Sequence, residues 1–157
     1  MQFNLRSAIP LAMAAGLLAT LTLSPVWRVT ADNDDGEEGR CSNRTLRGDY
    51  GFSIDGQILA GPSRILIRGV AMTRFDGHGN VSQVDWVTLN GVPASPDWRP
   101  SSGTYHLNPD CTGTMEFDFG GGSPILHLRL VVADRGREIR TVVESGPSAG
   151  STGIKVH

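Results

Sequence analysis

This 157-residue sequence lacks the patterns of the common enzyme and metal sites. It contains no Gly-x-Ser-x-Gly segment, phosphate loop or dinucleotide fingerprint. Its four histidines (His78, His106, His127 and His157) do not have the spacing of zinc ligands. No catalytic signature remains, and we predict neither a metal nor a cofactor.

An excess of positive charge is also missing. The formal net charge is -2, and from Cys41 onward 11 basic residues balance 11 acidic ones. A neutral domain without a basic stripe argues against nucleic acid and anionic membrane surfaces as partners. The remaining acids lie in DNDDGEEGR, residues 32–40, which is poor in apolar residues. We expect this tract to be a disordered acidic arm.

Long hydrophobic runs are absent except for one near the N-terminus. Residues 9–23, IPLAMAAGLLATLTL, form an apolar run of 15 residues, which is shorter than the ~20 of a membrane span. Arg6 precedes the run, and Val29 and Ala31 follow it in the small-residue pattern of a cleavage site. We predict a signal peptide over residues 1–31, a secreted or periplasmic location, and no stable membrane span after cleavage. An uncleaved anchor is the alternative.

Cysteine is scarce, because only Cys41 and Cys111 occur. In an exported chain, an even pair most simply forms one disulfide. A bridge closing a loop of about 70 residues would stabilise the fold by roughly 4 kcal/mol. The alternative is a pair of free thiols.

Helical periodicity is nearly absent after residue 40, and apolar residues alternate with polar ones instead. Tyr50, Phe52 and Ile54 share one face of their segment, and seven or eight such segments follow one another. Short glycine-containing links such as DGHGN, NPDCTG and GGGSP suit hairpins. We predict an all-β domain over residues 41–157, a single antiparallel up-and-down barrel of about eight strands, because closure removes exposed edges. We expect the glycine-rich segment 145–153 to be a mobile link and Trp86 to belong to the core.

Three segments in this order resemble a group of small exported bacterial proteins: CSNRTLRGDYGF (41–52), FDGHGN (75–80) and GTYHLNPDCTGT (103–114). The group is similar to the small barrels related to allene oxide cyclase and dirigent proteins, a class akin to lipocalins. The resemblance covers most of residues 41–145 and implies a barrel. It transfers no catalytic residue.

Two polar segments have competing interpretations. FDGHGN lacks the further acids of a calcium loop, and we interpret it as a hairpin turn. If the strands flanking GGGSP pair, Asp118 faces His127 and Glu116 faces Arg129, while Glu144 faces His127 from the next strand. We interpret these charges as a solvated outer face. In the alternative, they line the barrel lumen and His127 acts as an acid/base group.

Three hypotheses about function stay open. The first is an exported barrel that binds a small apolar ligand. The second is a cofactor-independent cyclase or isomerase that uses polar groups such as His127 and Glu116. The third is a passive secreted or envelope interaction protein with a filled core. The candidate ligand-binding residues are Tyr50, Phe52, Trp86, Trp98 and Phe117. The direction of four small residues separates a cavity from a filled core: Gly51, Gly69, Ala71 and Ser82.

Overall fold

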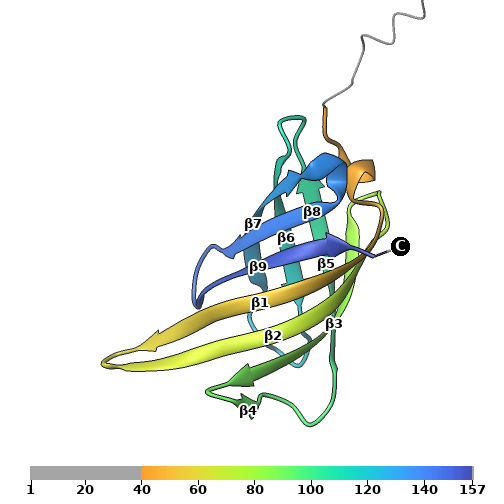
Figure 1. Cartoon of the computed structure of the whole chain (residues 1–157). Helices are drawn as coiled ribbons and strands as arrows, with labels where there is room; N and C mark the ends of the chain where they lie inside the picture. The colour runs from red at the N-terminus through yellow and green to blue at the C-terminus, as the bar shows by residue number, and fades with distance from the viewer. Residues whose placement is uncertain (1–39, 157) are drawn as a thin grey trace, which may run out of the picture. The chain divides into compact units, whose positions relative to one another are not determined.

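Residues 40–156 are described by the computed structural model, and they form a β-barrel (Figure 1). Its elements are η1 (Asn43–Leu46), β1 (Gly48–Ala60), β2 (Ser63–Phe75), β3 (Asn80–Leu89), β4 (Val92–Pro93), β5 (Arg99–Leu107), β6 (Thr112–Asp118), β7 (Leu126–Ala133), η2 (Asp134–Gly136), β8 (Glu138–Val143) and β9 (Ser148–Lys155). No helix in this part of the chain is long and apolar enough to cross a membrane. The predicted signal peptide and all but Arg40 of the acidic arm lie outside the described residues.

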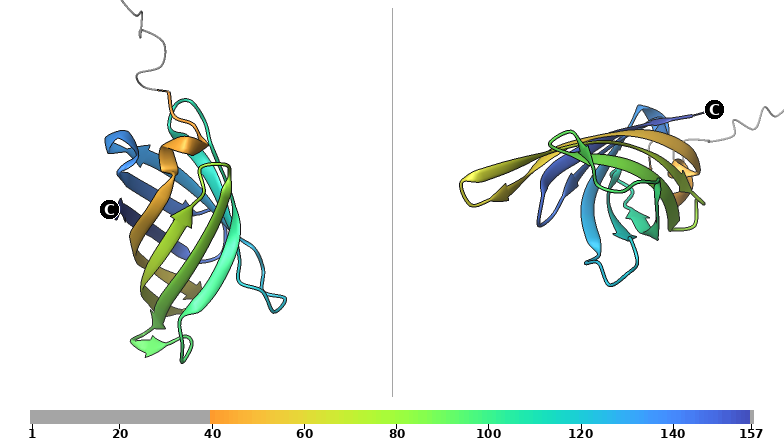
Figure 2. Two further views of the ribbon diagram at one scale, coloured as in Figure 1. Left: turned by 90° about the vertical axis from the view of Figure 1, so that its right-hand side faces the viewer. Right: turned by 90° about the horizontal axis from the view of Figure 1, so that it is seen from below.

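The barrel wall is an antiparallel meander. Each long strand pairs with the next along the chain, and β1 also pairs with β9, which closes the ring. The two-residue β4 pairs only with the end of β3, so eight of the described strands make the wall. The predicted up-and-down barrel is therefore confirmed. The β1–β2 hairpin projects beyond the wall, because β1 pairs with β2 as far as Ala60 but with β9 only as far as Gln57 (Figure 2).

Large apolar side chains fill the end of the barrel where β1 begins, here called the closed end. The rings of Tyr50, Phe75 and Tyr105 meet edge to face, with centroids 5.3 and 4.9 Å apart. Leu46 of η1 and Ile139 of β8 are fully buried beside them. This half of the barrel is a packed core.

The segment CSNRTLRGDYGF covers this closed end. Cys41 forms the predicted disulfide with Cys111, and their Cα atoms lie 5.0 Å apart. The backbone N–H of Cys41 also donates to the carbonyl of Pro109 at 3.1 Å. The Tyr50 hydroxyl donates to the carbonyl of Gly136 in η2. The cysteine and the tyrosine thus tie the start of the domain to two distant turns.

The glycine-rich segment 145–153 was predicted wrongly as a mobile link. Residues 148–153 of this segment lie in β9, which pairs with β1 on one side and β8 on the other. Glycine brings these strands close together, because a Cβ on Gly56 would lie 2.3 Å from the Cβ of Ala149. The segment is a strand because two neighbours hold it, although it lacks an alternating apolar pattern.

Candidate ligand-binding cavity

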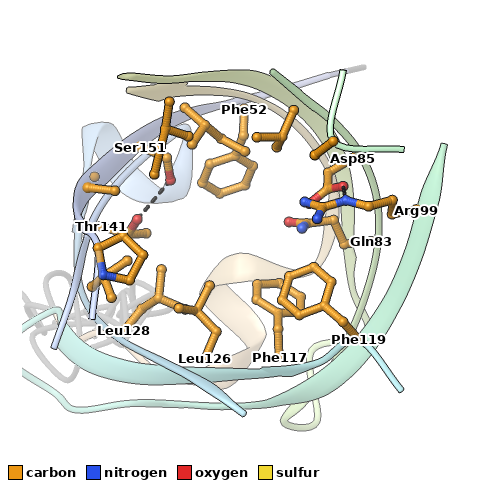
Figure 3. A pocket seen from close by; sticks show the side chains of 18 of the residues that line it. Phe52, Gln83, Asp85, Arg99, Phe117, Phe119, Leu126, Leu128, Thr141 and Ser151 are labelled. Atoms are coloured by element: carbon orange, nitrogen blue, oxygen red, sulfur yellow. Dashed lines mark hydrogen bonds and ion pairs between the residues drawn. The ribbon is translucent and has the colours of Figure 1, made fainter. Parts of the chain in front are cut away.

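The opposite half of the barrel, here called the open end, contains a cavity of about 310 Å³ (Figure 3). Strands around the ring contribute to its walls, together with the loop residues Ala94 and Pro147. Most of its surface is apolar, and these side chains include Phe52, Ile54, Ile67, Val87, Leu89, Met115, Phe117, Phe119, Leu126, Leu128 and Val143.

Small residues of β9 on the inner face leave this space. Gly69 and Ala71 also point inward from β2, but they do not line the cavity, and a Cβ on Gly69 would lie 2.8 Å from the side chain of Val87. Ala149 and Ser151 of β9 line the cavity where larger side chains would close it. The other two residues singled out from the sequence, Gly51 and Ser82, alternate with buried neighbours and lie on the outer face.

One wall of the cavity is polar. Asp85 of β3 and Arg99 of β5 are direct cross-strand partners, and the guanidinium holds the carboxylate through Nε at 2.8 Å and Nη2 at 2.9 Å. Asp85 is only 2% exposed. The guanidinium lies 5.3 Å from the centroid of the Phe119 ring, within cation–π range. Gln83 lies beside them, and its Oε1 accepts a hydrogen bond from Thr73 at 2.8 Å.

A second polar pair lies across the cavity from this wall (Figure 3). The hydroxyls of Thr141 and Ser151 are 2.7 Å apart and bond to each other across β8 and β9. One hydroxyl donates to the other, so this bond uses one of the two O–H groups of the pair. The wall of Gln83, Asp85 and Arg99 carries more polar groups and is the main polar feature that a ligand would meet.

The five predicted ligand-binding residues lie in different parts of the structure. Phe52 and Phe117 line the cavity. Tyr50 instead packs in the closed end. Trp86 lies on the outer face, where its ring meets that of the exposed Trp98 with centroids 6.1 Å apart. Placing Trp86 in the core was wrong, because Asp85 and Val87 on either side of it take the inward positions.

The predicted acid/base candidates lie outside the barrel. Glu116 faces His127, and the carboxylate is 3.2 Å from Nδ1, with both side chains about half exposed. The predicted pairing of His127 with Asp118 is therefore wrong by two residues. Glu144 bonds to Arg129 on the same outer surface, and Asp118 caps the following turn by accepting from the N–H of Gly120 at 2.7 Å. The solvated outer face is confirmed, and the lumen alternative is wrong.

The FDGHGN segment forms the predicted hairpin turn. Asp76 accepts hydrogen bonds from the N–H groups of His78 and Asn80 and from the Asn80 side chain. The Asn80 side chain, followed by the His78 N–H, lowers the pKa of Asp76 to about 2. Both carboxylate oxygens of Asp76 therefore accept hydrogen bonds within the turn. Among residues 40–156, no cluster of three His, Cys, Asp or Glu side chains is placed to hold a metal ion.

Sequence reasoning missed the polar wall, although a signal for it existed. Gln83 and Asp85 lie on the same face of β3 as the apolar Val81, Val87 and Leu89, because residues two apart in a strand point the same way. The partner, Arg99, comes from a proline-flanked loop in the sequence, and only the β3–β5 pairing places it opposite Asp85.

Comparison with known proteins assigns no family to this barrel. No protein-family model matches the chain, and the search of curated proteins finds no match either. The interpretation of the cavity therefore rests on its own geometry.

Proposed function

We propose that the protein binds a small apolar ligand in the open end of its barrel. The observation that carries this proposal is the apolar cavity of about 310 Å³ between Phe52, Phe117 and Leu128. This volume lies at the lower end of the roughly 300–1,000 Å³ range of pockets that hold small molecules. Apolar walls with a few placed polar groups are the usual composition of such sites.

The two halves of the barrel favour binding over a passive, filled interior. Large side chains such as Phe75 and Tyr105 pack against each other at the closed end. At the open end, Ala149 and Ser151 occupy inward positions where larger residues would complete the packing. Burying an apolar ligand there would remove apolar wall from water at about 25 cal/mol for each Å².

The cyclase or isomerase alternative loses the residues on which it was based. His127, Glu116, Asp118 and Glu144 lie on the outer surface and do not reach a ligand in the cavity. The resemblance to the allene oxide cyclase and dirigent class supports only the proposed barrel relationship.

We further propose that the chain is exported by way of residues 1–31. The disulfide between Cys41 and Cys111 fits an oxidising compartment. Edman sequencing of the protein recovered from its host would test this proposal. An N-terminus at Asp32 is expected, and an intact Met1 would contradict cleavage.

The binding proposal predicts different effects from two neighbouring substitutions. Val143 lines the cavity, whereas Val142 points outward and is 54% exposed. Filling the cavity by Val143→Trp should weaken binding of the fluorescent apolar probe N-phenylnaphthylamine by at least about tenfold, the equivalent of about 1.4 kcal/mol. Val142→Trp is the matched control and should bind the probe like the wild type.

Fluorescence titration measures these affinities, and native mass spectrometry of protein purified from its host looks for a retained small molecule. Equal probe binding by both variants and the wild type would place the probe outside the cavity and contradict the proposal. A wild type that binds no probe and carries no added mass would contradict it as well.

A further inference from the structure

Three polar side chains on one wall of the cavity lie side by side. Asp85 and Arg99 face each other across β3 and β5, and Gln83 lies two residues before Asp85 on the same face of β3. Their amide, carboxylate and guanidinium groups extend toward the lumen (Figure 3). A ligand in this cavity would therefore contact a defined polar surface as well as apolar walls.

Most of the hydrogen-bonding capacity left on this wall belongs to donors. The guanidinium of Arg99 has five N–H groups, and the bonds to Asp85 use one on Nε and one on Nη2. Within the described part of the chain, Nη1 has no hydrogen-bond partner. Gln83 uses its Oε1 to accept from Thr73, which leaves the two N–H groups of its amide for a ligand. The wall thus suits a ligand atom that accepts hydrogen bonds.

The charges on this wall select against an ionised acceptor. Asp85 already neutralises Arg99 at 2.8 Å and is itself almost completely buried. A ligand carboxylate at the guanidinium would lie close to this second carboxylate, where repulsion is screened less than in water. A neutral carbonyl oxygen accepts the same hydrogen bonds without that repulsion.

We propose that the ligand carries an uncharged hydrogen-bond-accepting oxygen, such as a ketone or ester carbonyl, and that Arg99 and Gln83 bind it. Asp85 is then a positioning residue, which holds the guanidinium in place and neutralises it. This inference rests on the proposed function, because it names the ligand class for the same cavity.

The test uses three compounds of nearly the same shape that compete with bound N-phenylnaphthylamine. Benzylacetone carries a neutral ketone, isopentylbenzene replaces the ketone by a branched hydrocarbon, and hydrocinnamate replaces it by a carboxylate. Each is titrated against the wild type, Asp85→Asn, and the double variant Asp85→Leu/Arg99→Met. The matched control is Arg129→Met/Glu144→Leu, which removes an ion pair from the outer face.

We expect the double variant to bind benzylacetone about tenfold more weakly, since it loses hydrogen bonds from a charged donor. Its affinity for isopentylbenzene should not fall, and the control should bind all three compounds like the wild type. Hydrocinnamate should bind the wild type at least about tenfold more weakly than benzylacetone and should gain affinity in Asp85→Asn, where Arg99 is no longer neutralised.

Three outcomes would overturn the inference. In the first, the double variant weakens benzylacetone and isopentylbenzene equally. In the second, hydrocinnamate is the tightest of the three in the wild type. In the third, Asp85→Asn does not raise the affinity for hydrocinnamate, and this result also decides the matter if the double variant does not fold. If the probe and isopentylbenzene bind the wild type but one of these three outcomes occurs, the proposed function stands without the inference. If the probe does not bind the wild type, both fail.

Discussion

Two tyrosine hydroxyls at the closed end hold backbone segments that are distant in sequence. Tyr50 donates to the carbonyl of Gly136, and its side chain is fully buried. Tyr105 donates to the carbonyl of Asn43 at 2.9 Å and accepts from the N–H of Gly77 at 3.0 Å. Each hydroxyl thus satisfies polar backbone groups that the barrel buries, and each ties a turn or a 3₁₀ segment to the wall.

The stability of the fold should depend on the ionisation of a single residue, Tyr50. Burial, and next the neighbouring Tyr105, raise the pKa of Tyr50 from 10.0 to about 12. The folded state therefore holds this proton more tightly than the unfolded state. The contribution of the Tyr50 proton to the free energy of unfolding is complete below pH 10.0 and is lost as the pH rises toward about 12.

Tyr50→Phe should lower the free energy of unfolding by about 1–3 kcal/mol at neutral pH, because the Gly136 carbonyl loses its donor. Above pH 10.0 the variant should lose stability less steeply than the wild type, because this titration is gone. Urea denaturation across this range measures both effects. Parallel curves for the two proteins would contradict the assignment of the pH dependence to Tyr50.

At the level of the strands, the backbones of β5 and β6 come closest together at Gly103. A Cβ on Gly103 would lie 1.7 Å from the carbonyl oxygen of Glu116, which is backbone and cannot rotate away. Gly51 of β1 is different, because a Cβ there would meet nothing within 4 Å. Alanine substitutions at these two positions therefore distinguish the effect of close strand spacing on stability from the effect of losing a glycine.

Gly103→Ala should lower the free energy of unfolding by at least about 3 kcal/mol, because β5 and β6 must separate. Gly51→Ala, the matched control, should change it by less than about 1 kcal/mol and in the stabilising direction, since alanine restricts the unfolded chain. Thermal and chemical denaturation of both variants measure the difference. Similar losses in the two variants would show that the close approach of β5 and β6 does not limit stability.

For the whole molecule, the disulfide is the covalent link between the entrance of the domain and its middle. Cys41 and Cys111 are separated by 70 residues, so the bridge restricts much of the unfolded barrel. Replacing both by alanine should lower the free energy of unfolding by about 4 kcal/mol and the melting temperature by roughly 10–20 °C. Calorimetry of wild type and variant, with and without reductant, measures this. Reductant should not affect the variant, and an unchanged melt of the reduced wild type would contradict the prediction.

Pairings between strands were only partly predictable. The β7–β8 register agrees with the prediction that Glu144 faces His127, because Leu128 pairs with Val143 and the N–H of Glu144 donates to the carbonyl of His127 at 2.9 Å. The β6–β7 register does not, because Glu116 rather than Asp118 faces His127. The loop of three successive glycines between these strands allows several lengths of turn. A slip of two residues keeps every side chain on its face, so the pattern could not distinguish the registers.

The sequence by itself determined the barrel and the disulfide, because alternation with period two and a single pair of cysteines allow few other solutions. Only the tertiary structure decided where the cavity lies and what lines it. β9 is a strand because β1 and β8 pair with it, and its small residues leave the open end unfilled. Asp85 can be buried inside the barrel because Arg99 of another strand pairs with it. The residues next to Asp85 in the sequence do not indicate a partner that comes from a different strand.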